Sequence, residues 1–242
     1  MHPSIRFQKS EVLKDLPPVT FTTLMAEMSS EQEAAYTAMR KELVAEIKGV
    51  QITAAHAATK LLKLLQISLG SCRNEDGDVF HLDAANRLGV CEELVSETSN
   101  NAIVFVPFTA ALDSVAAHLR KHGHHVEVVD GRTSDKERQR IFDEFQNEPG
   151  RRVLVAHPRT TSHGLTLTRA DVTVWYGPVT NLDWFEQANN RMNRPGQVNP
   201  MTVVCIAANA LELELYSALK AKQQMQNTVL AMFKSELGLP RE

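Results

Sequence analysis

Gln187, Arg191 and Arg194 are the residues of this chain whose types and spacing most suggest chemistry. If they belong to one helix, their offsets of four and seven residues place all three on the same face. Guanidinium groups bind phosphate oxygens bidentately and stay charged at any working pH. The same two arginines could instead complement the dipole at the end of a helix. Spacing alone leaves a phosphate site and a structural role equally open.

The helix that would carry these residues has recognisable ends. Asn181 and Asp183 both have side chains that can cap a first turn, so either can mark the beginning. Pro195–Gly196 predicts the end, because proline lacks a backbone donor and glycine accepts the backbone angles of a helix terminus. The helix is therefore expected to run through both arginines.

The composition is that of an ordinary soluble protein, with 43% hydrophobic and 23% charged residues among 242. This length allows one large domain or two small ones. The formal net charge is −3, so contact with nucleic acid would need a local basic patch. The three cysteines are widely spaced, which suggests reduced thiols, and neither a membrane-spanning run nor a signal pattern occurs. We therefore expect a cytoplasmic protein without a membrane partner.

From Asn101 onward, short apolar runs alternate with helical patterns. Helices are predicted over 110–121 and 134–146, the second capped by Ser134. Such alternation indicates an α/β fold with a parallel sheet, whose ligands bind at the carboxyl ends of the strands. The predicted strands are Ala102–Pro107, His125–Val129, Arg152–Ala156, Val172–Tyr176 and Met201–Ile206.

The segments on either side are mostly helical, so we divide the chain into three parts. These are a linker and mainly helical extension (1–100), an α/β core (101–210) and a C-terminal helix that packs on the core (211–242). A β-branched run at Val19–Leu24 could be a strand, and a turn or hairpin is expected at 70–78. The predicted helices are Glu31–Lys48, which has a capping box at its start, Ala54–Leu69, Ala84–Glu97 and Leu211–Glu236.

Polar loops follow four of the predicted strands. They are Pro107–Thr109, Asp130–Thr133, His157–Thr168 and Gly177–Thr180. A polar loop after a strand is common, so each alone says little. Four such loops on one edge of a sheet, with hydroxyl groups and glycines suited to phosphate contacts, favour a phosphate-bearing ligand.

The order of these segments resembles a known family. Asn101–Thr109, Val128–Thr133, Val153–Asp171 and Gln187–Gln197 look like helicase motifs IV, V and VI, in the form found in the Swi/Snf-type ATPases of helicase superfamily two. The entry segment Lys9–Pro18 is similar to the link that follows the first motor lobe in these proteins. The resemblance spans nearly the whole chain and is closest in style to the short phage and bacterial members.

This resemblance implies a second RecA-like lobe of a DNA-dependent ATPase motor. By position, Arg194 would be the arginine finger for a γ-phosphate held by the first lobe, and Arg191 its companion. Gln187 would help to couple nucleotide to lobe closure, and Gly164 would allow a close backbone approach. An arginine finger stabilises charge on the transferring phosphoryl group and is worth roughly a thousandfold or more in rate. The residues expected along the DNA backbone are Phe108, Thr109, Arg132, Thr160 and Thr161.

Several positions depart from the family pattern. Thr166 stands where asparagine is usual, Ser162 where glycine or alanine is usual, and Thr180 where an aromatic residue is common. The sequence has no Gly-x-x-x-x-Gly-Lys-Ser/Thr, so it lacks a P-loop. Asp143–Glu144 lies inside a predicted helix rather than after a strand, so it is not a DExx box. The chain is therefore expected to be half of a motor, a fragment that is inactive towards ATP by itself.

Four histidines cluster near a predicted helix end: His118, His122, His124 and His125. They could bind a metal, but no cysteine lies nearby, and exposed histidines at a helix end are the commoner case. We predict no metal site.

Two functional hypotheses follow. In the first, the chain is the second motor lobe of an ATP-driven translocase on double-stranded DNA, bacterial or phage-encoded and associated with the nucleoid. It then completes a site for ATP and Mg²⁺ that an N-terminal RecA-like lobe mainly forms. In the second, it is a non-catalytic module that binds DNA or protein. The missing P-loop favours the second for this chain alone, whereas the two arginines favour the first for a longer parent protein. An unrelated α/β nucleotide enzyme would need a glycine-rich first turn, which the sequence lacks.

Overall fold

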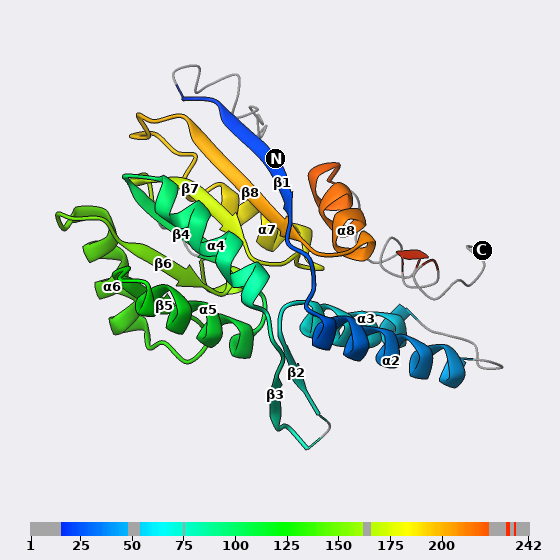
Figure 1. Cartoon of the computed structure of the whole chain (residues 1–242). Helices are drawn as coiled ribbons and strands as arrows, with labels where there is room; N and C mark the ends of the chain where they lie inside the picture. Colours follow the sequence, from blue (N-terminus) through cyan, green and yellow to red (C-terminus); the bar gives the residue numbers. More distant parts are fainter. Residues whose placement is uncertain are drawn as a thin grey trace.

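A parallel sheet of six strands lies at the centre of the molecule (Figure 1). The computed structural model describes residues 16–47, 54–74, 76–161, 166–222, 231–232 and 235. The strands of the sheet are β1 (Val19–Met25), β4 (Asn101–Phe105), β5 (Val126–Val129), β6 (Val153–Ala156), β7 (Ala170–Trp175) and β8 (Met201–Ala207). Their order is β1-β8-β7-β4-β6-β5, and every neighbouring pair is parallel. All six carboxyl ends therefore lie at one edge, which confirms the predicted parallel sheet.

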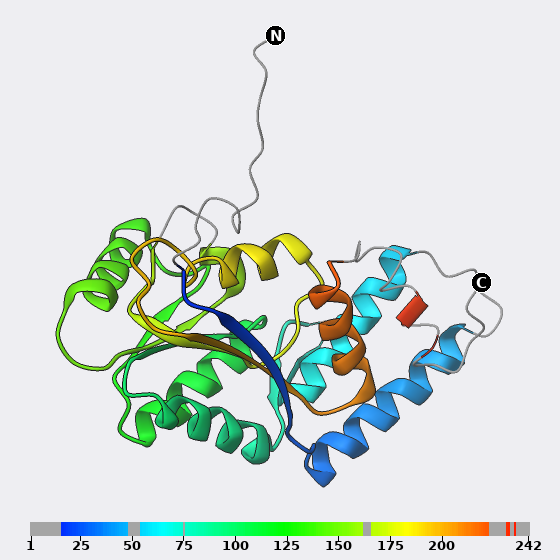
Figure 2. The ribbon, with the colours of Figure 1, turned by 90° about the horizontal axis from the view of Figure 1, so that it is seen from above.

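Helices cover both faces of this sheet (Figure 2). One face carries α4 (Ala85–Glu97) and α5 (Thr109–Lys121), and the other carries α6 (Asp135–Asn147), α7 (Leu182–Asn189) and α8 (Ala210–Lys220). A 3-10 helix, η1 (Pro158–Thr161), follows β6. Beside the sheet lie the helices α2 (Ser30–Ile47) and α3 (Ala54–Ser68), which are followed by a short hairpin of β2 (Ser71–Arg73) and β3 (Val79–His81).

The strands divide their side chains between two cores, because successive residues of a strand point to opposite faces. In β4, Ile103 and Phe105 join the core that also contains residues of α3, α6, α7 and α8. Ala102 and Val104 join the core that contains residues of α4 and α5. Every residue of β4 is buried, as expected for a central parallel strand covered on both faces.

Three helices begin where their capping residues predict. Ser29 and Gln32 form the predicted capping box, each accepting a hydrogen bond of 3.1 Å from the other's backbone N–H. Ser134 caps α6 and Asn181 caps α7, because each side chain accepts from a backbone N–H three residues further on. Of the two candidates for the cap of α7, the structure thus selects Asn181.

Two features differ from the sequence prediction. β1 pairs with β8 at the edge of the sheet, so the sheet takes one strand from the segment assigned to the linker and helical extension. The single helix predicted over Leu211–Glu236 is wrong, because α8 ends at Lys220. Lys222 has a positive φ of 54°, a left-handed conformation that cannot continue a right-handed helix. The three-part division of the chain stays a prediction.

Candidate functional site

Arg191 and Arg194 lie on a turn and not on a helix. α7 ends at Asn189, so the prediction that one helical face carries Gln187 and both arginines is wrong. The helix ends before the arginines, and the side chain of Met192, which lies between them, is buried in the core with 0% exposed. The carbonyl of Arg191 also accepts a hydrogen bond of 3.0 Å from the N–H of Leu167, a residue just before β7. We call residues 190–196 the arginine turn.

Two buried side chains hold the arginine turn in place. Gln197 donates to the carbonyls of Ala170 (2.9 Å) and Met192 (3.4 Å), and its own oxygen accepts from two backbone N–H groups that follow it. Trp175 of β7 donates from its indole N–H to the Asn189 side chain at the end of α7, over 3.0 Å. Hydrogen bonds therefore connect the two sides of the arginine turn to the start and to the end of β7.

The two guanidinium groups of the arginine turn act on each other. Arg191 is only 5% exposed, and burial together with the positive charge of Arg194 lowers its pKa. Arg194 is half-buried and donates from Nε to the carbonyl of Asn190. Gln187 is exposed on α7, one turn earlier in the chain. The arginine turn therefore combines a buried and a half-buried arginine, and guanidinium groups are suited to binding anions.

A second group of predicted residues meets at the carboxyl edge of the sheet. Loops after three neighbouring strands, β4, β6 and β5, enclose a cavity of about 380 Å³, which we call the carboxyl-edge pocket. It brings together two of the predicted DNA-binding residues, Thr109 and Thr160, with three basic residues that the sequence did not single out. Its lining residues are Thr109, Gly131, Arg138, His157, Arg159 and Thr160.

His157 is fixed in its neutral form beside this pocket. Its Nδ1 accepts from the backbone N–H of Arg159 (3.2 Å), so its Nε2 carries the proton and donates to the carbonyl of Pro107 (3.1 Å). Its ring also meets the edge of Trp184 at the start of α7, with centroids 5.9 Å apart. Burial is the main cause that lowers the pKa of His157. The position of His157 directly after β6 is the signal that could have identified it.

The other predicted DNA-binding residues do not line this pocket. Arg132 forms two hydrogen bonds to Asp113 (3.0 and 2.6 Å) and one from Nε to Asp130 (2.8 Å), and these carboxylates raise its pKa. Phe108 is half-buried at the N-cap of α5. The side chain of Thr161, and Gly164 entirely, lie outside the described residues.

The fourth polar loop does not contribute to an open edge. Residues 177–179 are buried, and Leu69, the residue after α3, packs against Gly177. A Cβ atom at Gly177 would lie only 2.4 Å from a methyl carbon of Leu69. The expectation that four loops are available to a ligand at this edge is therefore wrong for the loop Gly177–Thr180.

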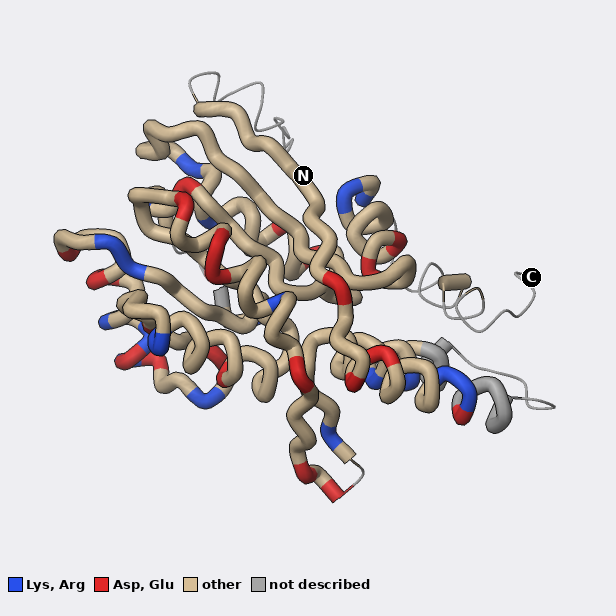
Figure 3. The backbone as a smooth tube through the Cα atoms, in the orientation of Figure 1, with Lys and Arg blue, Asp and Glu red and all other residues tan. Residues whose placement is uncertain are grey.

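Charged residues of both signs are interspersed along the described chain (Figure 3). On α6, Arg140 contacts Glu137 (2.6 Å) and Glu144 (2.5 Å), so Glu144 belongs to an ion-paired helix surface, as expected for Asp143–Glu144. Among the described residues, no group of three or more His, Cys, Asp and Glu side chains is arranged to hold a metal ion. Within the same residues, no helix is both long enough and apolar enough to span a membrane.

Both sites lie within one segment that resembles a known protein family. The model of the helicase conserved C-terminal domain matches residues 86–196, which include the carboxyl-edge pocket and the arginine turn. This segment, a little under half of the chain, is similar to the helicase conserved C-terminal domain. An uncharacterized ATP-dependent helicase of Mycoplasma pneumoniae is 26% identical over 230 residues, which make up 93% of this chain but only 22% of that protein. The chain thus spans about a fifth of the length of this relative.

Solved structures confirm the predicted RecA-like fold of the domain. The Sulfolobus solfataricus SWI2/SNF2 ATPase C-terminal domain has a TM-score of 0.64 at 20% identity, covering 93% of this chain and 99% of that one. The ATPase core of the same organism in complex with dsDNA has a TM-score of 0.69 at 21% identity, covering 97% of this chain and 53% of that one. The fold predicted for the chain, that of the C-terminal lobe of these ATPases, is therefore confirmed.

Proposed function

We infer that this domain is the second motor lobe of an ATP-dependent DNA translocase. The observation that carries this proposal is the arginine turn, which places the buried Arg191 and the half-buried Arg194 within three residues of each other. Two guanidinium groups in one turn can together bind one anionic group through several charge-assisted hydrogen bonds. A pure binding module has no need for such a pair.

The ligand proposed for the arginine turn is the phosphate chain of ATP with its Mg²⁺, held mainly by another lobe. Two arginines suit this group, because guanidinium forks match phosphate oxygens and keep their charge. Arg194 is the more exposed of the two and is the proposed arginine finger, while the more buried Arg191 adds charge behind it. Gln187 lies one helical turn away on α7 and is the proposed link between nucleotide and lobe closure. Because the sequence has no P-loop, the chain by itself is expected to be inactive towards ATP.

The carboxyl-edge pocket is the proposed contact with the backbone of double-stranded DNA. Thr109 and Thr160 supply hydroxyl groups, Arg159 is an exposed cation, and α5 begins at the pocket with no side chain capping its first turn. Backbone N–H groups at a helix start, hydroxyls and arginines are the groups that bind DNA phosphates without reading sequence. Arg132 would have to leave two carboxylates to do the same, so it ranks below Arg159.

One loop connects the two proposed sites. It begins at the carboxyl edge with His157 and Thr160, which line the pocket, and it reaches Leu167 at the opposite edge. There the N–H of Leu167 donates to the carbonyl of Arg191.

The deciding experiment measures DNA-stimulated ATP hydrolysis by a polypeptide in which this chain follows its P-loop lobe. The variant Arg194→Ala should lower turnover by roughly a thousandfold, and Arg194→Lys should restore little, because lysine lacks the guanidinium fork. Arg140→Ala, which removes an exposed and ion-paired arginine of α6, is the matched control and should leave turnover unchanged.

The alternative is a non-catalytic module that binds DNA or protein. The lack of a P-loop in the sequence is the observation that favours it. If Arg194→Ala and Arg140→Ala show the same turnover, or if DNA stimulates no hydrolysis in the two-lobe polypeptide, the motor proposal fails and the binding module is preferred.

A further inference from the structure

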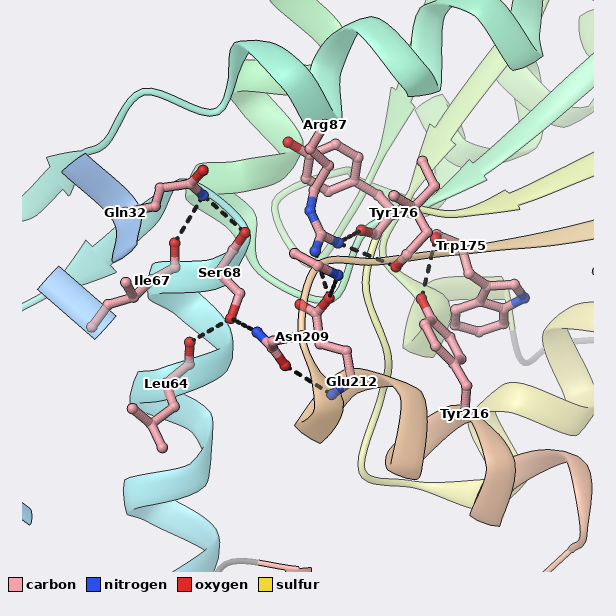
Figure 4. Close-up of polar contacts among 12 residues, drawn as sticks. Gln32, Leu64, Ile67, Ser68, Arg87, Trp175, Tyr176, Asn209, Glu212 and Tyr216 are labelled. Carbon is pink, nitrogen blue, oxygen red and sulfur yellow. Dashed lines mark hydrogen bonds and ion pairs between the residues drawn. The ribbon is translucent and has the colours of Figure 1, made fainter. Parts of the chain in front are cut away.

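Arg87 of α4 and Glu212 of α8 form an ion pair in the interior, away from both proposed sites (Figure 4). Their side chains are 2% and 0% exposed, and Nη2 of Arg87 lies 2.5 Å from Oε2 of Glu212. Removing two charges from water is expensive, and an apolar pair of similar volume often stabilises a fold as well or better. A contribution to stability therefore does not by itself explain why these two charged residues are buried here.

The ion pair holds the carboxyl ends of two neighbouring strands. Nη1 of Arg87 donates to the carbonyls of Tyr176 (2.5 Å), directly after β7, and Ile206 (3.2 Å), near the end of β8. The carboxylate of Glu212 also accepts from the N–H of Ala208 (2.6 Å). Burial tends to lower the pKa of Arg87, but the charge of Glu212 raises it overall, so the guanidinium remains charged. Apolar side chains could fill this space but could not hold the two carbonyls.

From these strand ends a chain of contacts leads to the arginine turn. Tyr216 lies one turn after Glu212 on α8, and its hydroxyl donates to the carbonyl of Trp175 (3.1 Å). The indole of Trp175 in turn donates to Asn189, the last residue of α7. Arg191 follows two residues later. α8 thus positions the end of β7, and the end of β7 positions the end of α7.

In the other direction the contacts lead to α2 and α3. The Asn209 side chain accepts from the N–H of Glu212 (3.0 Å) and donates to the hydroxyl of Ser68 (3.1 Å), the last residue of α3. Gln32 of α2 donates to the carbonyl of Ser68 (2.9 Å). Figure 4 shows this line of polar groups passing from α2 and α3 to α8 and the ends of β7 and β8.

We propose that Arg87 and Glu212 are positioning residues that set the arginine turn relative to α2 and α3. They contact neither phosphate nor DNA, and they act through the strand ends, Trp175 and α7. The consequence for turnover rests on the function proposed above for Arg191 and Arg194. The expected change in structure does not depend on that function, because it concerns only the position of the end of α7.

The first test measures amide hydrogen exchange in the 242-residue chain. Both test variants nearly keep the size of the side chain. Glu212→Gln removes the negative charge of the ion pair, and Arg87→Lys removes the guanidinium group that bonds Glu212 and two backbone carbonyls at once. The matched control is Asn101→Ala, because Asn101 is also 2% exposed and bonds two backbone groups, but at the amino end of β4. Relative to β5 and α5, exchange over 182–194 should rise about tenfold in both test variants and not in the control. An even rise over the whole chain would overturn the proposal.

The second test measures turnover in the two-lobe polypeptide. Both variants should lower kcat by about ten- to a hundredfold, while the DNA concentration for half-maximal stimulation stays within about twofold, because the DNA pocket is elsewhere. The double variant Arg87→Met/Glu212→Leu, which refills the space with apolar atoms, should fold and show the same loss. Wild-type kcat in that double variant would also overturn the proposal. If Arg194→Ala leaves turnover intact, the proposed function fails, and the exchange pattern still decides the positioning role.

Discussion

Among single residues, His157 combines a pKa lowered mainly by burial with two hydrogen bonds that its neutral ring makes. Its neutral ring satisfies two backbone groups, one as donor and one as acceptor. Protonation of Nδ1 would set its new N–H against the N–H of Arg159, two donors facing each other. The low pKa of His157, caused first by burial, therefore reflects the order of the loop that lines the carboxyl-edge pocket.

This shift predicts how stability depends on pH. Between the lowered pKa of the folded chain and the ordinary value of about 6.5, only the unfolded chain binds the proton, so the free energy of unfolding rises with pH. We expect wild type to lose more stability than His157→Gln between about pH 7.5 and 5, with slopes differing by at most about 1.4 kcal/mol per pH unit. Urea unfolding at several pH values measures this. His81→Gln, which removes an exposed histidine of β3, should follow wild type, and identical slopes in all three would contradict the assignment.

The sequence predicted some residues of the candidate site but gave no sign of the buried ion pair. It predicted that polar loops meet at one edge, and Thr109 and Thr160 do line the same pocket. It did not indicate Arg87, because a charged residue in an amphipathic helix is normally exposed. The partner of Arg87 lies 125 residues away, and no local pattern connects two such positions.

Among the elements, most helix bounds could be predicted to within a residue or so, but the ends of α7 and α8 could not. The caps Ser29, Ser134 and Asn181 act on their own first turns, so the signal is local. The end of α7 depends on Trp175 and Leu167, which belong to other parts of the chain. Pro195–Gly196 is a valid stop signal, but tertiary contacts end the helix six residues before it.

Leu69, the residue after α3, packs against Gly177 in the loop after β7, and the stability that this contact contributes can be tested. A methyl group at Gly177 would meet Leu69, which is 1% exposed, with Cγ only 2.8 Å away. Gly177→Ala should therefore cost about 1–3 kcal/mol, the usual cost of overpacking. In a Leu69→Ala background the same change should cost less, because the clashing atoms are gone. Chemical denaturation of the four proteins gives this coupling energy.

A helical glycine provides the control for that cycle. Gly89 of α4 has no heavy atom within 4 Å of a Cβ built on it. Gly89→Ala should stabilise the chain by about 0.5–1 kcal/mol, through helix propensity alone. If Gly177→Ala behaves like Gly89→Ala, or costs as much without Leu69 as with it, the close packing of α3 on this loop is not significant in solution.

For the whole molecule, the charge distribution limits how DNA can bind. The formal net charge is −3, and many arginines are already paired with carboxylates, as Arg132 and Arg140 are. Long-range attraction to DNA is therefore weak, and binding depends on the few cations at the carboxyl edge. The fold places those cations on the same edge as the start of α5, so a small basic surface can act together with backbone N–H groups.

This arrangement predicts the salt dependence of duplex binding. The chain should bind double-stranded DNA without sequence preference, and its affinity should fall as salt rises, because bound phosphates release counterions. Arg159→Gln should weaken binding of every duplex alike and reduce the slope of log K against log salt by about 1. Arg169→Gln removes the same charge from an exposed arginine at the opposite edge, where it bonds the Glu148 carbonyl, and should leave the slope unchanged. Fluorescence anisotropy at several salt concentrations measures both slopes. Equal losses in the two variants would mean that DNA responds only to net charge and does not enter the carboxyl-edge pocket.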